Sequence, residues 1–293
     1  MRKKNKKVTG FDIGLYTIFG ILGLLTLYPF YYVVIVSFTN TQASAMYTPY
    51  LYPHVFDLTG YKMIIGDVYF FKSVMTTLFV TLVGTTLNMV ISVMTAYVLS
   101  RKRLVGRKQI FLFITFTMLF SGGLIPTYLV VSNLGLTNSI WSMIFPGMIS
   151  TYYVIIMKNY FSGLPQSLED AAKIDGANDL KVLYKIYLPI SKPFMATFAL
   201  FYAVERWNEW WNAYLYISDK NIKPLQIYLR DILVNFSNQL STQAQSMVNS
   251  QGKVYVQSVQ MATIVITMLP IMCLYPFLQK YFVKGVMIGA IKE

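Results

Sequence analysis

The chain has 293 residues, of which 55% are hydrophobic and only 13% are charged. Soluble globular domains carry about a quarter charged residues, so much of this surface must face something other than water. The net charge of +13 raises the question of a nucleic-acid partner, but the basic residues lie between apolar runs and do not form one face. The composition predicts an integral membrane protein in contact with the lipid bilayer, with no nucleic acid as a partner.

Six apolar runs are long enough to cross a bilayer, which takes about 20 residues in a helix. The first run follows a basic start, but it is too long for a signal-peptide core and no small-residue cleavage site follows it, so we expect a retained helix. The fold class predicted is an all-α integral membrane protein, with residues 1–293 forming a single transmembrane domain. The predicted spans cover residues 12–38, 73–99, 109–131, 139–160, 190–217 and 258–282.

The distribution of Lys and Arg predicts the orientation, because cytoplasmic loops carry the excess of these residues. With the N-terminus inside, 18 of the 25 basic residues fall in inner segments and six in outer ones, while Arg206 lies within a span. Both termini are therefore expected in the cytoplasm.

Two connections are too long to be simple turns, and long loops in compact proteins are often functional. They are the inner segment 161–189 and the outer segment 218–257. The outer one contains a plausible short amphipathic helix at residues 225–233, followed by a stretch rich in Ser, Gln and Asn.

The inner segment carries local signals for two short helices. Ser167 is a good N-cap with Asp170 three residues later, so a first helix should start there. It should end at Gly176, which can adopt a left-handed conformation. A second helix should cover residues 180–187 and stop before Pro189. The result is a helix, turn, helix element that projects into the cytoplasm.

This element has a face of small and apolar side chains outside the membrane, and such a face needs a partner. Either it packs under the chain's own transmembrane bundle, or it is a docking helix for a cytoplasmic subunit. The residues of the face are Ala171, Ala172, Ile174, Ala177, Leu180, Leu183 and Tyr184.

A longer pattern in the same segment resembles the EAA loop of binding-protein-dependent ABC importer permeases. It consists of Asp170, Ala171, Ala172, Gly176, Ile186, Leu188 and Pro189. The family usually has Glu where this chain has Asp170, which keeps the charge. The stretches at residues 122–128, 207–210 and 284–289 are similar to the carbohydrate-uptake class, in particular to the second permease of oligosaccharide systems. The resemblance covers nearly the whole chain.

The resemblance implies a permease subunit of an ATP-driven importer, multi-pass in the bacterial cell membrane, that forms half of the pathway for a sugar or oligosaccharide. Its implied partners are a second homologous permease, two ATP-binding cassette subunits and an extracellular solute-binding protein, which the outer loop 218–257 would meet. The tail from Lys284 is a further implied ATPase contact. The implied ATPase-coupling residues are Glu169, Asp170, Ala171, Ala172, Asp175, Gly176, Ile186, Leu188 and Pro189, with Asp170 and Gly176 as the main ones.

The sequence contains no motif for enzymatic chemistry or for holding a cofactor. No Gly-x-x-x-x-Gly-Lys-Ser/Thr phosphate loop occurs, so ATP and Mg should bind to the partner subunits. Cys273 is the only cysteine and His54 the only histidine, which excludes an intrachain disulfide and a zinc cluster. We expect a buried thiol at Cys273 and no function for His54.

The fifth predicted span contains charges that are costly in hydrocarbon and are functional candidates by default. Glu205 and Glu209 lie one turn apart and should share a helical face, with Arg206 on the neighbouring face. The alternative is a structural ion pair or a place near the outer interface. The nearby aromatic rings either stack on sugar rings or anchor the membrane interface. The candidate substrate pathway comprises Glu205, Trp207, Asn208, Glu209 and Trp210.

Gly122, Gly123 and Pro126 interrupt the third apolar run, where a helix should kink or break. The sequence allows two interpretations of this interruption: a hinge that moves during gating, or a static kink.

Other functions fit the sequence less well. A secondary transporter would have no reason to carry the EAA spacing, a membrane enzyme would need convergent acids, bases or metal ligands, and a scaffold leaves the intramembrane charges unexplained. A sugar or oligosaccharide is the expected substrate, and an amino acid, peptide or polyamine is the alternative.

Overall fold

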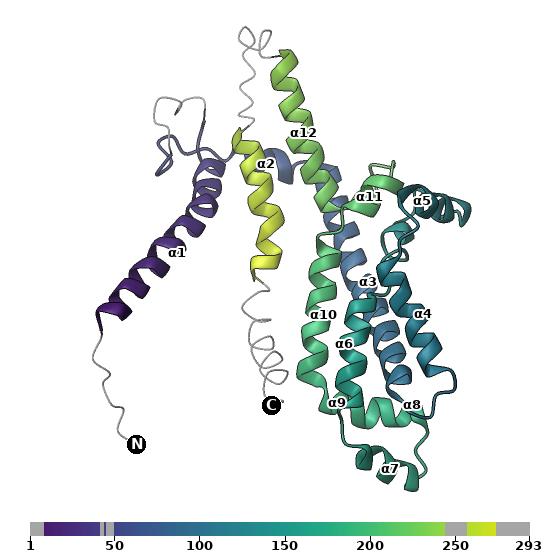
Figure 1. Cartoon of the computed structure of the whole chain (residues 1–293). Coiled ribbons are helices and arrows are strands. Elements are labelled where there is room, and N and C mark those ends of the chain that lie inside the picture. The colour runs from purple at the N-terminus through teal and green to yellow at the C-terminus, as the bar shows by residue number, and fades with distance from the viewer. Residues whose placement is uncertain (1–8, 42–43, 45–49, 244–256, 274–293) are drawn as a thin grey trace. The chain divides into compact units, whose positions relative to one another are not determined.

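The computed structural model describes residues 9–41, 44, 50–243 and 257–273, and the elements found there are helices apart from one isolated bridge between Thr39 and Phe56 (Figure 1). The predicted all-helical class is confirmed for these residues. The basic start and the tail from Lys284 lie outside them. Two compact units divide the chain: Met1–Asp67 with Leu229–Leu269, and Val68–Tyr228 with Pro270–Glu293.

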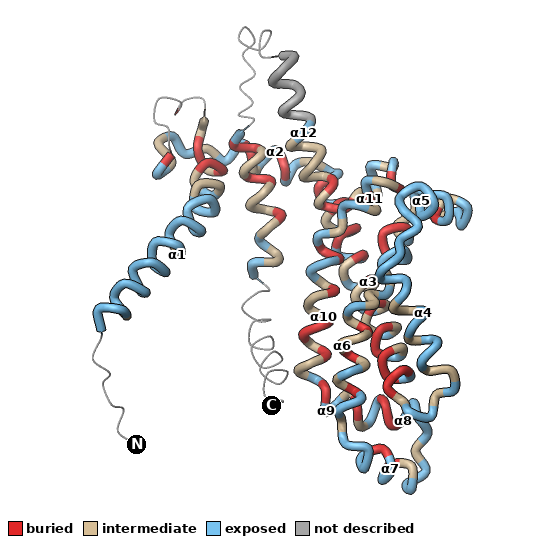
Figure 2. Tube along the Cα trace, viewed as in Figure 1, coloured by how far each residue is buried: buried red, intermediate tan, exposed pale blue. Residues whose placement is uncertain are grey.

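The first unit contains a long apolar helix, α1, whose side chains are exposed along most of its length (Figure 2). Exposed side chains of this kind suit a lipid environment. In the same unit, α2 lies close to the last described helix, because a Cβ atom added to Gly60 would be 3.2 Å from the Cα atom of Val259. The bounds are Gly10–Ser37 for α1, Thr59–Ile65 for α2, Leu225–Gln243 for α12, which begins in the second unit, and Gln257–Cys273 for the last helix.

The second unit is a bundle built around α3, which packs against α6 and α10 (Figure 1). Its core is formed by large side chains from these helices, with Tyr97, Phe161 and Tyr202 among them. The bounds are Val68–Ser100 for α3, Arg107–Leu119 for α4, Leu124–Asn133 for α5, Ile140–Met143 for the 3-10 helix η2, Thr151–Ser162 for α6, Lys192–Trp207 for α10 and Trp211–Tyr216 for α11.

Two of the described helices, α1 and α3, are long and apolar enough to cross a membrane, and the bent pair α4 and α5 makes a third if it counts as one span. They correspond to the predicted runs 12–38, 73–99 and 109–131. The last run, 258–282, is helical as far as Cys273 and otherwise lies outside the described residues. Cys273 is exposed in the chain, so the expected buried thiol is wrong. The count of six spans and the orientation of the termini stay predictions.

The third predicted run breaks at Gly123, which has φ 90° and ψ 176°. This backbone conformation is essentially restricted to glycine. The two flanking helices, α4 and α5, are bent by 114° relative to each other, so the interruption is a break and not a mild kink. Whether the break moves stays open.

The fourth predicted run is not one helix. A single 3-10 turn, η2, is followed by non-helical backbone at residues 144–150 before α6 begins. Serine side chains cap the two helices, since the hydroxyls of Ser139 and Ser150 accept backbone N–H groups of Trp141 and Tyr153. These caps favour helix starts on both sides of the gap.

The fifth predicted run also differs, because α10 ends at Trp207 and α11 starts anew at Trp211. The Glu209 carboxylate accepts the backbone N–H of Asn212 at 3.0 Å, and an acidic group at a helix start is stabilising. The expectation that Glu205 and Glu209 share one helical face is therefore wrong, since the backbone turns between them.

Candidate functional site

The expected cytoplasmic element starts two residues earlier than predicted. Helix α7 (Gln166–Ile174) has Pro165 as its N-cap, so the predicted cap at Ser167 is wrong. The pyrrolidine ring holds φ near the helical value, here −59°, and prepares the chain for the helix. Gly176 ends the helix in the left-handed region at φ 74°, as predicted.

The second part of the element runs through Pro189 and does not stop before it. It comprises α8 (Asp179–Val182), the π-helix η3 (Leu183–Tyr187) and α9 (Leu188–Ile190). Proline lacks an N–H group and crowds the preceding turn. The wider π turn, with Leu188 N–H bonded to the carbonyl of Leu183, accommodates it. The predicted helix end is therefore wrong.

The apolar face is divided between buried and exposed side chains, so packing under the chain's own bundle is confirmed for part of it and docking stays a prediction for the rest. Ala172 and Leu183 are buried in the bundle core, whereas Ile174 is 87% exposed and Leu180 and Tyr184 are more than half exposed. The element is fixed to its own bundle by one side and presents apolar side chains on the other. Among the predicted coupling residues, those exposed are Asp170, Ala171, Asp175, Gly176 and Pro189, those half-buried are Ile186 and Leu188, and those buried are Glu169 and Ala172.

Glu169 points into the protein, where it is 6% exposed. Its carboxylate pairs with the Arg101 guanidinium and accepts a hydrogen bond from Lys173, while Arg103 lies 4.0 Å away. Burial raises the pKa of Glu169, but the hydrogen bond from Lys173 and the three positive charges outweigh it, so the net pKa is lowered. The carboxylate is therefore charged at neutral pH.

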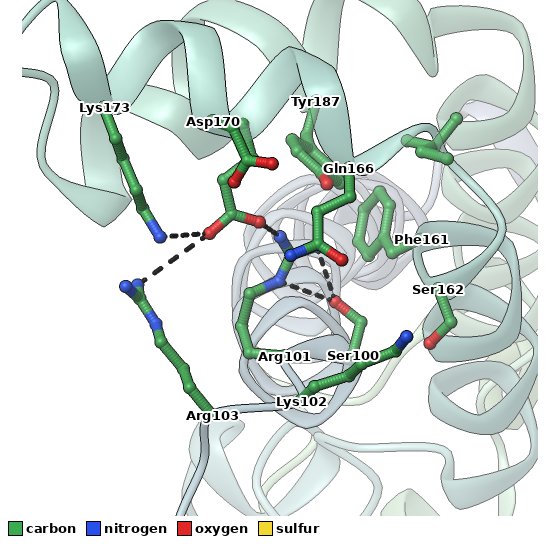
Figure 3. Close-up of a pocket in the computed structure, with 12 residues that line it drawn as sticks. Ser100, Arg101, Lys102, Arg103, Phe161, Ser162, Gln166, Asp170, Lys173 and Tyr187 are labelled. Carbon is green, nitrogen blue, oxygen red and sulfur yellow. Dashed lines mark hydrogen bonds and ion pairs between the residues drawn. The ribbon is translucent and has the colours of Figure 1, made fainter.

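Arg101 lies at the end of α3, where its guanidinium lies over two aromatic rings. The guanidinium carbon is 4.4 Å from the ring centre of Tyr97 and 4.5 Å from that of Tyr187. Two of its nitrogens donate to the Ser100 hydroxyl, at 3.1 Å and 2.9 Å. Ser100, Arg101 and Tyr187 line an open cavity of about 330 Å³, together with residues of α7 (Figure 3).

The sequence did not single out Arg101 or its two tyrosines. Arg101, Lys102 and Arg103 were interpreted only as loop charges that set the orientation. A weak signal existed, because Tyr97 lies four residues before Arg101, a spacing at which an aromatic ring and a cation meet on a helix. Nothing local, however, indicates that Glu169 is its partner.

Another arginine, Arg206, lies in the last turn of α10 and is buried, with 4% of its surface exposed. It donates to the carbonyl oxygens of Met143 at 2.6 Å and Ile144 at 3.1 Å and also to that of Gly147, all at or in the non-helical stretch before α6. A fourth acceptor is the side-chain oxygen of Asn88 on α3, at 3.1 Å. Arg206 thus satisfies carbonyl groups that the broken helix leaves without partners.

The candidate substrate-pathway residues do not form one face. Glu205 is exposed and accepts a hydrogen bond from Tyr153, Asn208 is exposed and accepts one from Gln226, and Trp210 is 46% exposed. By contrast, Glu209 is half-buried, 3.8 Å from Arg206, and Trp207 is buried. The indole N–H of Trp207 has no hydrogen-bond partner within the described structure.

The described residues contain no group of three or more His, Cys, Asp or Glu placed to hold a metal ion.

Comparison with known proteins assigns the family. The model of the family described as "Binding-protein-dependent transport system inner membrane component" matches residues 88–288. This chain belongs to that family. The resemblance seen at residues 170–189 is thereby confirmed, and the chain is a membrane component of a transport system.

This chain is similar to several known proteins over nearly its full length. It is 40% identical to the polygalacturonan/rhamnogalacturonan transport system permease protein YtcP of Bacillus subtilis, over 96% of this chain and 98% of that protein. It is 41% identical to protein LplC of the same organism, over 96% and 95% of the two chains. A chain in the crystal structure of a bacterial ABC transporter that imports the acidic polysaccharide alginate shares its fold with a TM-score of 0.84 and 32% identity, covering 95% of this chain and all of that one.

Proposed function

We propose that this permease is one of two membrane subunits of an ATP-driven importer and that it forms half of the pathway for an oligosaccharide. The names of its relatives support a carbohydrate, because they describe transport of polygalacturonan, rhamnogalacturonan and alginate. An amino acid, peptide or polyamine has no such support.

The observation that carries the proposal is the exposed side of α7. Asp170 and Ile174 are exposed, while Glu169 and Ala172 are buried and hold the helix to the bundle. A rigid short helix with a free carboxylate and a free apolar side chain provides a contact for another subunit. Two ATP-binding cassette subunits are the expected partners, with Asp170 and Gly176 at the contact.

The remaining partners follow from the family. A second permease would complete the pathway, and an extracellular binding protein would deliver the sugar near residues 218–257. ATP and Mg would be held by the cassette subunits, and this chain would perform no chemical step itself.

Within the pathway, the exposed members of the predicted set are the candidates for sugar contact. Glu205 and Asn208 would meet hydroxyl groups, and Trp210 would offer a flat apolar face. Trp207 and Glu209 would support them, since both side chains are committed to packing or to capping α11.

The test compares two glycines that share a left-handed backbone. Gly176 (φ 74°) lies in the coupling loop and Gly135 (φ 68°) in the predicted outer loop, and a Cβ added to either would meet nothing within 4 Å. Replacing either by valine imposes a similar backbone strain of about 1–2 kcal/mol. Uptake of labelled oligosaccharide into vesicles that hold the complete transporter, together with retention of the cassette subunits, is measured for both variants.

We expect Gly176→Val to lose cassette binding and ATP-dependent uptake, while Gly135→Val keeps both. Equal uptake in the two variants would contradict the coupling role proposed for this loop. Retained ATP turnover without sugar uptake in the wild-type complex would instead contradict the carbohydrate substrate.

A further inference from the structure

Helix α7 is attached to its own bundle by few side chains. Its buried residues are Glu169 and Ala172. Ala172 contributes one methyl group to the core, so directional attachment depends on the Glu169 carboxylate. The principal partner of that carboxylate is Arg101, whose side chain is 10% exposed.

Arg101 contacts three elements at once. Its backbone directly follows α3, its guanidinium pairs with Glu169 of α7, and its flat face lies over Tyr187 at the end of η3. Tyr97 of α3 lies over the same guanidinium, and the rings of Tyr97 and Tyr187 are 5.3 Å apart in an edge-to-face arrangement. The three elements therefore meet at one side chain (Figure 3).

Only arginine suits this place. Its guanidinium is planar and presents several donors in a fixed geometry, so it can stack on the tyrosine rings and still reach the carboxylate and the Ser100 hydroxyl. A lysine ammonium would keep the charge and three donors, but it has no flat face to stack on the rings and does not hold its donors in a fixed planar geometry. We call Arg101 with Glu169, Tyr97, Tyr187 and Ser100 the clamp. Its several contacts hold the guanidinium in one place, unlike a loose surface ion pair.

We propose that Arg101 is a positioning residue that makes α7 and the cytoplasmic end of α3 move as one body, so that a displacement of α7 passes directly into α3. This inference rests on the proposed function, because it assumes that a cassette subunit displaces α7. It adds the route by which that displacement enters the bundle. Arg101 needs no contact with the cassette subunit or the sugar for this role.

The direct test is a distance measurement in the complete transporter. Spin labels are placed at Ser167 on α7 and at Val98 on α3, two exposed positions, in a Cys273→Ser background that retains ATP-dependent uptake. The clamp predicts one narrow distance distribution that is the same in the nucleotide-free and ATP-trapped states. A distance that changes between the two states shows that α7 moves relative to α3 and overturns the proposal.

A second test uses the conservative substitution Arg101→Lys. We expect sugar uptake per ATP hydrolysed to fall about tenfold, equivalent to about 1.4 kcal/mol, while ATP hydrolysis persists, and we expect the distance distribution to broaden. The matched control is Arg107→Lys at the start of α4, outside the clamp, which should leave the ratio unchanged. An unchanged ratio and an unchanged distribution in Arg101→Lys overturn the proposal. Absence of ATP-dependent uptake in the wild type contradicts the proposed function instead.

Discussion

Two arginines in the same unit, Arg101 and Arg206, keep a positive charge away from most of the solvent in different ways. Arg101, which directly follows α3, is partly buried and faces a carboxylate and two aromatic rings. Arg206, within the bundle, donates to three backbone carbonyls and the amide oxygen of Asn88. Its nearest described carboxylate oxygen, on Glu209, is 3.8 Å away.

The difference shows what each arginine does for the fold. The Glu169 carboxylate belongs to a separate short helix, so the Arg101 contact joins α7 to the end of α3. Backbone carbonyls carry fixed dipoles that the chain itself holds in place, so the Arg206 contact fixes the non-helical stretch at residues 144–150. Arg206 thus serves the architecture, while Arg101 is the arginine that we propose for coupling.

The largest effect is expected when the architectural arginine is removed. Arg206→Ala removes the side-chain donor of the Met143 and Ile144 carbonyl oxygens, and each buried group left without a donor costs about 1–3 kcal/mol. After extraction into detergent, we expect a lower unfolding temperature and a smaller monodisperse fraction for this variant than for the wild type. Lys220→Ala, at an exposed residue in the same unit, is the control and should unfold like the wild type. Normal stability of Arg206→Ala would contradict this assignment.

The next effect concerns the space that Arg206 occupies. A Cβ atom at Gly84 would lie 3.0 Å from Cδ of Arg206, so Gly84→Val should push the arginine off its acceptors and cost about 1–3 kcal/mol. The same substitution at Gly20 of α1, where a Cβ would meet nothing within 4 Å, separates steric contact from helix propensity. The unfolding temperature of Gly84→Val should therefore be lower than that of Gly20→Val. Equal unfolding temperatures would mean that Arg206 can shift freely.

The smallest effect is expected at the coupling arginine when pH is changed. Because the pKa of Glu169 is lowered in the folded chain, its contribution is fully present above the ordinary carboxyl pKa and is lost as pH falls through the lowered value. A spin label at Ser167 should stay ordered at neutral and mildly acidic pH and gain mobility only in strong acid. Glu169→Gln should be mobile throughout. Mobility that rises near neutral pH would contradict the ion pair.

The sequence predicted what depends on local composition. The apolar runs located α1 and α3, and Gly123 and Gly176 were correctly expected to interrupt or end helices because few other residues tolerate those backbone angles. The pattern around Asp170 and Gly176 identified the family. These features are encoded over short stretches, so they can be seen without the fold.

The sequence could not predict what depends on tertiary contacts. In the gap at residues 144–150, Arg206, 59 residues beyond Gly147, supplies donors that a continuous helix would have provided. In the same way, Glu169 was interpreted as a contact for another subunit, although Arg101, 68 residues earlier, holds it inside the bundle. Hydropathy and spacing carry no information about such long-range pairs.

The measurement that tests the central claim most directly is uptake of labelled oligosaccharide into vesicles that contain this permease with its partner permease, cassette subunits and binding protein. The account predicts uptake when ATP and binding protein are both present and none when either is omitted. Uptake that proceeds without ATP, or that does not need the binding protein, would contradict it.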